Sequence, residues 1–230
     1  IGMDDVLSLT TSLHFTGEFS CYARTKVTRN MNARPFTIEA MIKPTGKAAL
    51  QTIFALDNEK EPLWFAWAGD HLEAQIGKVR LQSATVEPIL DFTRVALTYN
   101  PEDSIARFFV GTQEVNYKIK NDEDNENNAK PSYHSAGQLI WGNNATYDAP
   151  FQGDMLEARL WTKALTQAEL ARYKDCHLTG YERELVAYYP MNEGKGTTCA
   201  DKANGATLTL NGTSWVLPEG MSIHLNGAEP

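Results

Sequence analysis

Acidic residues on predicted strands are the first candidates for chemistry, because glycoside hydrolysis needs two carboxylates across a cleft, about 5 to 9 Å apart. Alternate residues of a strand share one face. Asp154 and Glu157 are three apart, which places them on opposite faces of a regular strand. The nearest same-face neighbour of Glu73 is Gln75, which is not an acid. Since the sequence also has no HExxH, GxSxG or P-loop motif, we predict a protein that is not an enzyme.

Aromatic side chains offer a second kind of chemistry, because the faces of sugars pack on aromatic rings while planar polar groups bind their hydroxyls. Trp64 and Trp67 are three apart and face opposite ways on a strand, so only one of them can join the core. Core or edge packing is the alternative for every candidate. The predicted ligand-binding residues are Trp64, Trp67, Tyr133, His134 and Tyr147.

The composition excludes several classes of partner. The chain has 230 residues, 42% of them hydrophobic, and a formal net charge of -8 with scattered basic residues. Nucleic acids and anionic membrane surfaces need clustered Lys and Arg, so neither is an expected partner. The sequence contains no run of about 18 apolar residues, so it predicts no membrane span, and we expect no direct membrane insertion. The first five residues do not resemble a signal peptide.

The three cysteines, Cys21, Cys176 and Cys199, form no CxxC pair, which argues against a zinc ribbon or a thioredoxin-type site. A Cys176–Cys199 disulfide would close a loop of roughly 23 residues and stabilise the fold by about 3 kcal/mol. The alternative is three reduced cysteines, and the sequence leaves both open.

The elements that must position these residues are short strands. Apolar and polar residues alternate with period two, and turn residues separate the segments, which is typical of an all-β sandwich or barrel. Thr166 and Glu169 form a capping box, which predicts one short helix near 166–175. The alternating segments include residues 36–43, 72–76, 94–99, 156–160 and 185–189.

We assign residues 1–216 to one domain. The segment SLHFTG at 12–17 is echoed by SIHLNG at 222–227, and LPEG at 217–220 reads as a linker. Residues 217–230 are therefore either a C-terminal strand or a linker that leads into a following repeat.

Eight phrases, in this order, resemble the laminin G-like and pentraxin-like domains of the concanavalin A-like lectin/glucanase superfamily. Each is short, but with Asp201 and Trp215 at familiar distances beyond the last of them, the resemblance covers about residues 12–216. They are LHFTG at 13–17, FTIEAMIKP at 36–44, QTIF at 51–54, FTRVALTY at 92–99, FFVG at 108–111, FQGDMLEARLW at 151–161, LTQAEL at 165–170 and LVAYYPMNEG at 185–194.

The resemblance implies an antiparallel jelly-roll sandwich of two sheets with one short helix. The related laminarinase-type glucanases carry ExDxE or ExDxxE, and neither motif occurs in this sequence. The resemblance therefore implies a non-catalytic module that binds a glycan or a glycosylated protein. Its setting would be a secreted or cell-surface protein, beside other domains of the same polypeptide. A structural or adhesion domain that binds protein partners is the alternative, and a glycoside hydrolase is a weaker one.

The resemblance to pentraxins also implies a calcium site. Calcium prefers six to eight hard oxygen ligands, and the matching loops supply carboxylates and amides. Those residues are Asp57, Asn58, Asn144 and Asp148. Asp201 and Asn204, in a turn-like segment, form a separate candidate cation site, with ordinary turn chemistry as the alternative for both sets.

Overall fold

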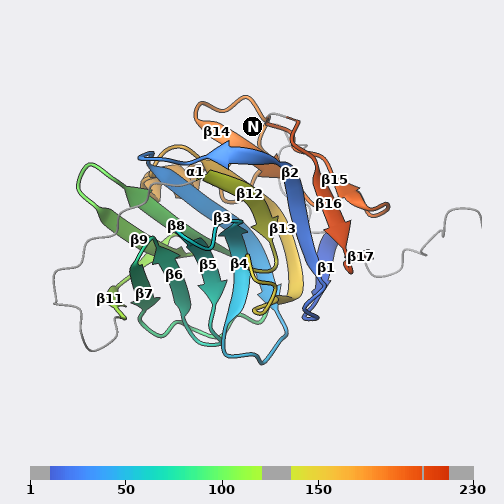
Figure 1. Cartoon of the computed structure of the whole chain (residues 1–230), viewed down its shortest axis with the longest axis horizontal. Coiled ribbons are helices and arrows are strands. Elements are labelled where there is room, and N and C mark those ends of the chain that lie inside the picture. The colour runs from blue at the N-terminus through green and yellow to red at the C-terminus, as the bar shows by residue number, and fades with distance from the viewer. Residues whose placement is uncertain (1–10, 121–135, 204, 218–230) are drawn as a thin grey trace, which may run out of the picture.

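The computed structural model describes residues 11–120, 136–203 and 205–217. Within them, an eight-stranded and a nine-stranded antiparallel sheet pack face to face (Figure 1). The predicted all-β jelly-roll sandwich is confirmed. In this part of the chain no helix is long and apolar enough to cross a membrane.

The smaller sheet has the strand order β10-β9-β8-β3-β13-β1-β17, and β14 pairs with β13. Its first and last strands along the chain, β1 and β17, are neighbours. The strands are β1 (Ser12–Thr16), β3 (Phe36–Pro44), β8 (Thr93–Asn100), β9 (Ile105–Val110), β10 (Gln113–Val115), β13 (Gln152–Trp161), β14 (Leu185–Tyr189) and β17 (Ser214–Val216).

The larger sheet has the order β11-β7-β6-β5-β4-β12-β2-β16-β15. It is made largely of consecutive hairpins, so β4, β5, β6 and β7 lie side by side (Figure 1). The strands are β2 (Tyr22–Asn30), β4 (Gln51–Leu56), β5 (Leu63–Trp67), β6 (Leu72–Ile76), β7 (Val79–Ser83), β11 (Tyr117–Ile119), β12 (Ala136–Trp141), β15 (Thr198–Cys199) and β16 (Leu208–Asn211).

The main core fills the space between the sheets, because alternate residues of each strand point inward. On β3 these are Ile38, Ala40 and Ile42. Aromatic rings add directional packing, as where Phe54 meets Trp141 edge to face with centroids 4.9 Å apart.

A second, smaller core lies on the outer face of the smaller sheet, beneath helix α1 (Gln167–Tyr173). Thr166 accepts a hydrogen bond from the Glu169 amide, and the Glu169 side chain accepts one from the Thr166 amide. The predicted capping box is therefore present, and Leu170 packs with Trp161 and Tyr188. The helix ends at Tyr173, two residues earlier than expected.

Strand β13 departs from regular alternation. Its pairing with β3 shifts between Leu156 and Arg159, and Glu157 has a φ of 52°. This β-bulge turns Glu157 to the same side as Arg159, to which it is hydrogen bonded. The prediction that Asp154 and Glu157 face opposite ways assumed a regular pleat, which the strand does not have at Glu157.

All three cysteines are free, so the reduced alternative holds and Cys176 is not bonded to Cys199. The described chain up to residue 217 forms one sandwich. Residues 218–230, which hold the segment 222–227 and all but the first residue of the predicted C-terminal strand or linker to a next repeat, lie outside the described residues.

Candidate functional site

A continuous row of side chains crosses the outer face of the larger sheet. Each member is the direct cross-strand partner of the next, while its chain neighbours, such as Phe65 and Leu139, point into the core. We call this the outer row. It runs Thr209, Arg24, Ile140, Ala55, Trp64, Gln75, Arg80 across β16, β2, β12, β4, β5, β6 and β7.

Arg24 is the centre of a polar cluster at one end of this row. Its guanidinium donates hydrogen bonds to the Tyr147 hydroxyl, to an Asp57 carboxylate oxygen and, at 2.8 Å from Nε, to Gln138. Burial opposes the charge on Arg24, but Asp57 outweighs it and the pKa of Arg24 is raised. The Tyr22 ring lies 4.8 Å from that of Tyr147, so the cluster combines planar polar groups with two aromatic rings.

The β12–β13 loop presents Tyr147 to Arg24. Asn144 fixes the loop, because its Oδ1 accepts the Asp148 amide at 3.0 Å and its Nδ2 donates to Asp148 Oδ1 at 2.6 Å. The hydrogen bonds from Asn144 and then Thr146 lower the pKa of Asp148. Tyr147 itself has a φ of 56°, a strained backbone that these bonds stabilise.

Trp64 and Arg80 form the other part of the row. The Arg80 guanidinium lies 5.2 Å from the centre of the half-buried Trp64 ring. It is held there by Glu73, which is 2% exposed and accepts from Arg80 Nη2 at 2.5 Å. His71 and Lys120 also contact Glu73. Burial raises the pKa of Glu73, but these three partners more than offset it and the pKa is lowered.

Ala55 and Ile140 lie between the two ends of the row, and at 2% and 0% exposed they are covered by the neighbouring side chains. Three strand spacings separate Trp64 from Arg24 along the row, which amounts to about 14 Å. The groups that could contact an amphipathic ligand across the strands are therefore the half-buried Trp64 ring at one end and the polar aromatic cluster at the other.

The structure brings together three sequence-predicted residues, Trp64, Tyr147 and Asp57, on this one face. Trp67 is not part of it, because it is 3% exposed and packs in the main core. Tyr133 and His134 lie outside the described residues.

The sequence reasoning missed Arg24, Tyr22 and Gln138. The available signal was alternation in β2, where Tyr22 and Arg24 flank the buried Ala23. Tyr22 and Arg24 therefore share the outward face of β2.

The predicted cation ligands already have protein partners. Asp57 is ion-paired with Arg24, and the Asn58 side-chain oxygen accepts the amides of Lys60 and Glu61. Asp201 Oδ1 accepts the amides of Tyr188 and Ala203, and Asn204 lies outside the described residues. Among the residues described, no three His, Cys, Asp or Glu side chains gather as a metal site. Calcium binding through Asp57, Asn58, Asn144 and Asp148 stays a prediction.

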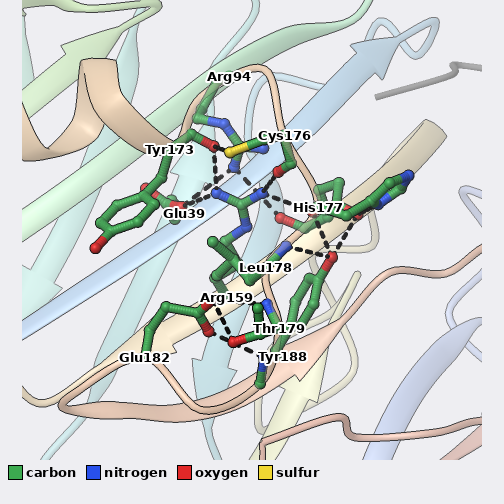
Figure 2. Close-up of polar contacts among 12 residues, drawn as sticks. Glu39, Arg94, Arg159, Tyr173, Cys176, His177, Leu178, Thr179, Glu182 and Tyr188 are labelled. Atoms are coloured by element: carbon green, nitrogen blue, oxygen red, sulfur yellow. Dashed lines mark hydrogen bonds and ion pairs between the residues drawn. The ribbon is translucent and has the colours of Figure 1, made fainter. Parts of the chain in front are cut away.

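A buried charge network lies on the opposite sheet and is a different kind of site. Arg159 forms ion pairs with Glu39, at 3.1 Å, and with Glu157, at 2.6 Å. Figure 2 shows Arg159 and Glu39 among the polar contacts of this network. Tyr188 donates to Glu157, and His177 contacts it at 2.9 Å. Both carboxylates are almost fully buried and held by guanidinium groups, so they are not placed to reach a substrate.

Comparison with known proteins identifies the fold family. The sequence profile of the concanavalin A-like lectin/glucanases superfamily matches residues 15–171. Among solved structures, a candidate carbohydrate-binding protein from Bacteroides ovatus ATCC 8483 superposes with a TM-score of 0.69 and 19% identity. That match covers 93% of this chain, which spans 61% of the Bacteroides protein.

A second similar structure is the heptameric SAP-like pentraxin of Limulus polyphemus, with a TM-score of 0.61 and 14% identity. The match covers 97% of this chain and 100% of the pentraxin. At these identities the likeness shows the fold. No curated protein matches the sequence.

Proposed function

Because the chain belongs to the concanavalin A-like lectin/glucanases superfamily, we propose that it binds carbohydrate without catalysing a reaction. The outer face of the larger sheet is the binding surface, with Trp64 at one end and the cluster around Arg24 at the other. The ligand is a glycan or the glycan of a glycosylated protein.

The observation that carries this proposal is the outer row. It aligns the half-buried Trp64 ring with convergent hydrogen-bonding groups in one direction on a rigid sheet. Arg24, Asp57 and Gln138 fix one another's positions, so little side-chain order has to be created when a ligand binds. A sugar chain suits such a surface, since it has apolar faces and hydroxyl-bearing edges.

The proposal extends to the setting of the module. The Bacteroides protein, itself a candidate carbohydrate-binding protein, is longer than this chain. We infer that the sandwich is one domain of a secreted or cell-surface protein and delivers glycan affinity to neighbouring domains. The test of that placement is whether the polypeptide is found on whole cells of its own source and is removed by protease added outside the cells.

A glycan array tests the binding function directly. The wild-type chain is expected to bind a defined set of glycans, and Trp64→Ala and Arg24→Ala are each expected to weaken that binding at least tenfold. Trp215→Ala is the matched control, because Trp215 is also half-buried but lies on β17 of the other sheet. Absence of binding, or equal losses in all three variants, would refute the proposed site.

A further inference from the structure

A groove at one edge of the sandwich forms a second candidate site. It lies where β2 of the larger sheet passes β14 of the smaller sheet, along the top of the view in Figure 1. Its volume is about 450 Å³, within the range of ligand pockets. The side chains that matter for its chemistry are Arg29, Arg34, Thr28, Asn30 and Thr162.

Arg29 spans the two sheets. It belongs to β2, pairs with Gly137 of β12, and its Nη2 donates to the carbonyl oxygen of Val186 on β14 at 3.0 Å. A guanidinium has five N–H donors. This bond therefore orients the half-buried Arg29 side chain and leaves most of its donors for a ligand in the groove.

The charge of the groove is opposite to that of the protein. The whole chain carries a formal charge of -8, yet two arginines and no acidic residue line this groove. Other arginines, such as Arg80 and Arg107, are neutralised locally by Glu73 and Glu114. Within the described residues, neither Arg29 nor Arg34 forms an ion pair with a carboxylate.

We propose that this groove binds an acidic saccharide, with its anionic group between Arg29 and Arg34. Arginine binds carboxylate and sulfate oxygens in a planar, bidentate fashion. The hydroxyls of Thr28 and Thr162 and the amide of Asn30 line the same groove and supply hydrogen bonds for sugar hydroxyls.

The groove is separate from the outer row. Arg24 and Arg29 lie on the same strand, about 16 Å apart along it. The proposal therefore stands independently of the function assigned to Trp64, and gives the module two sites with different ligand chemistry.

The test is a titration of the ¹⁵N-labelled chain at constant ionic strength with sodium glucuronate, glucose 6-sulfate, glucose and sodium sulfate. We expect shifts in the amides of Thr28, Arg29, Thr162 and Gly205 with the first two probes. Glucose and inorganic sulfate should each bind at least fivefold more weakly. The stronger of the two acidic sugars identifies a carboxylate or a sulfate as the preferred anion.

Arg29→Gln and Arg34→Gln should each weaken binding of the better acidic sugar about tenfold. Arg34 makes no side-chain bond within the described residues, so its replacement leaves the fold intact even if Arg29→Gln disturbs β14. Arg172→Gln, on the exposed face of α1, is the charge-matched control and should have no effect.

Three results would overturn the inference: no shifts at the groove, equal binding of inorganic sulfate and the acidic sugars, or equal effects of Arg34→Gln and Arg172→Gln. Trp64→Ala separates the two proposals, because it should abolish binding at the outer row while leaving glucuronate binding unchanged.

Discussion

Replacing Arg159 with Met is expected to be among the most damaging single changes in this protein. The Arg159 side chain is fully buried and forms ion pairs with Glu39 and Glu157. It also donates to the carbonyl oxygens of Tyr173 and Cys176, at 2.8 and 2.7 Å. One side chain thus joins β3, β13 and the segment after α1, as Figure 2 shows.

The magnitude follows from what the substitution leaves behind. Methionine fills much of the arginine volume, so the loss is mainly electrostatic. Two buried carboxylates lose their ion pair with Arg159 and two carbonyl groups lose its hydrogen bonds, and breaking a buried ion pair in this way costs about 3–5 kcal/mol. Arg94 lies 3.4 Å from Glu39 and offers partial compensation. Burial and then the charge of Arg159 lower the pKa of Arg94 to about 10, so Arg94 stays charged at neutral pH. For a domain of this size each kcal/mol lowers Tm by about 2–4 °C, so Tm should fall by roughly 6–20 °C.

Urea denaturation of the wild type, Arg159→Met and the exposed control Arg172→Met measures the effect. Adding Glu157→Gln to Arg159→Met should recover part of the stability, because it removes one uncompensated charge. Glycan binding should survive at temperatures where the variant is folded, because the network lies on the sheet opposite the outer row. A loss below 1 kcal/mol, or a further loss in the double variant, would refute this account of the network.

Three other predictions test the remaining elements. Because the pKa of Glu73 is lowered from its ordinary 4.5, its contribution to stability is present above pH 4.5 and disappears as the pH falls through the lowered pKa. In urea denaturation, the stability difference between wild type and Glu73→Gln should therefore shrink over that acid range. A difference that does not depend on pH would contradict the assignment. Thr166→Ala removes the N-cap of α1 and should cost about 0.5–2 kcal/mol. Thr207 is exposed and lies outside the helix, so a change in Tm no larger than that of Thr207→Ala would show that the capping box does not stabilise α1. If calcium binds between Asp57 and Asp148, free calcium at 100 times Kd should add about 2.7 kcal/mol to the free energy of unfolding; a Tm that is the same in calcium and in chelator, or a shift that persists in Asp148→Ala, would exclude that site.

The strands and the helix were accessible from the sequence because their signals are local. Alternation in 36–43 and 94–99 predicts β3 and β8, and Thr166 with Glu169 predicts the start of α1. These patterns depend on residues two to four apart, so tertiary context does not alter them.

The binding surface was only partly accessible, since it depends on register between strands distant in the chain. Trp64 and Arg24 belong to one row because β4 and β12 lie between their strands, and no local pattern specifies that order. The β-bulge at Glu157 is a similar case. The local sequence pattern predicts a regular strand there. The turned position of the Glu157 side chain is instead stabilised by its partners Arg159, Tyr188 and His177, which the local pattern does not specify.

The pair Trp64 and Trp67 shows where local reasoning ends. Period two requires the two rings to lie on opposite sides of β5, and they do. Which ring points inward depends on the facing residues: Leu63 and Phe65 share the inward face with Trp67, and the pairing of β5 with β4 and β6 aligns that face with the main core. Trp64 is therefore left on the outer face in line with Ala55 and Gln75. Its availability to a ligand is a consequence of the sheet's register, and a one-residue slip of β5 would bury it and expose Trp67 instead.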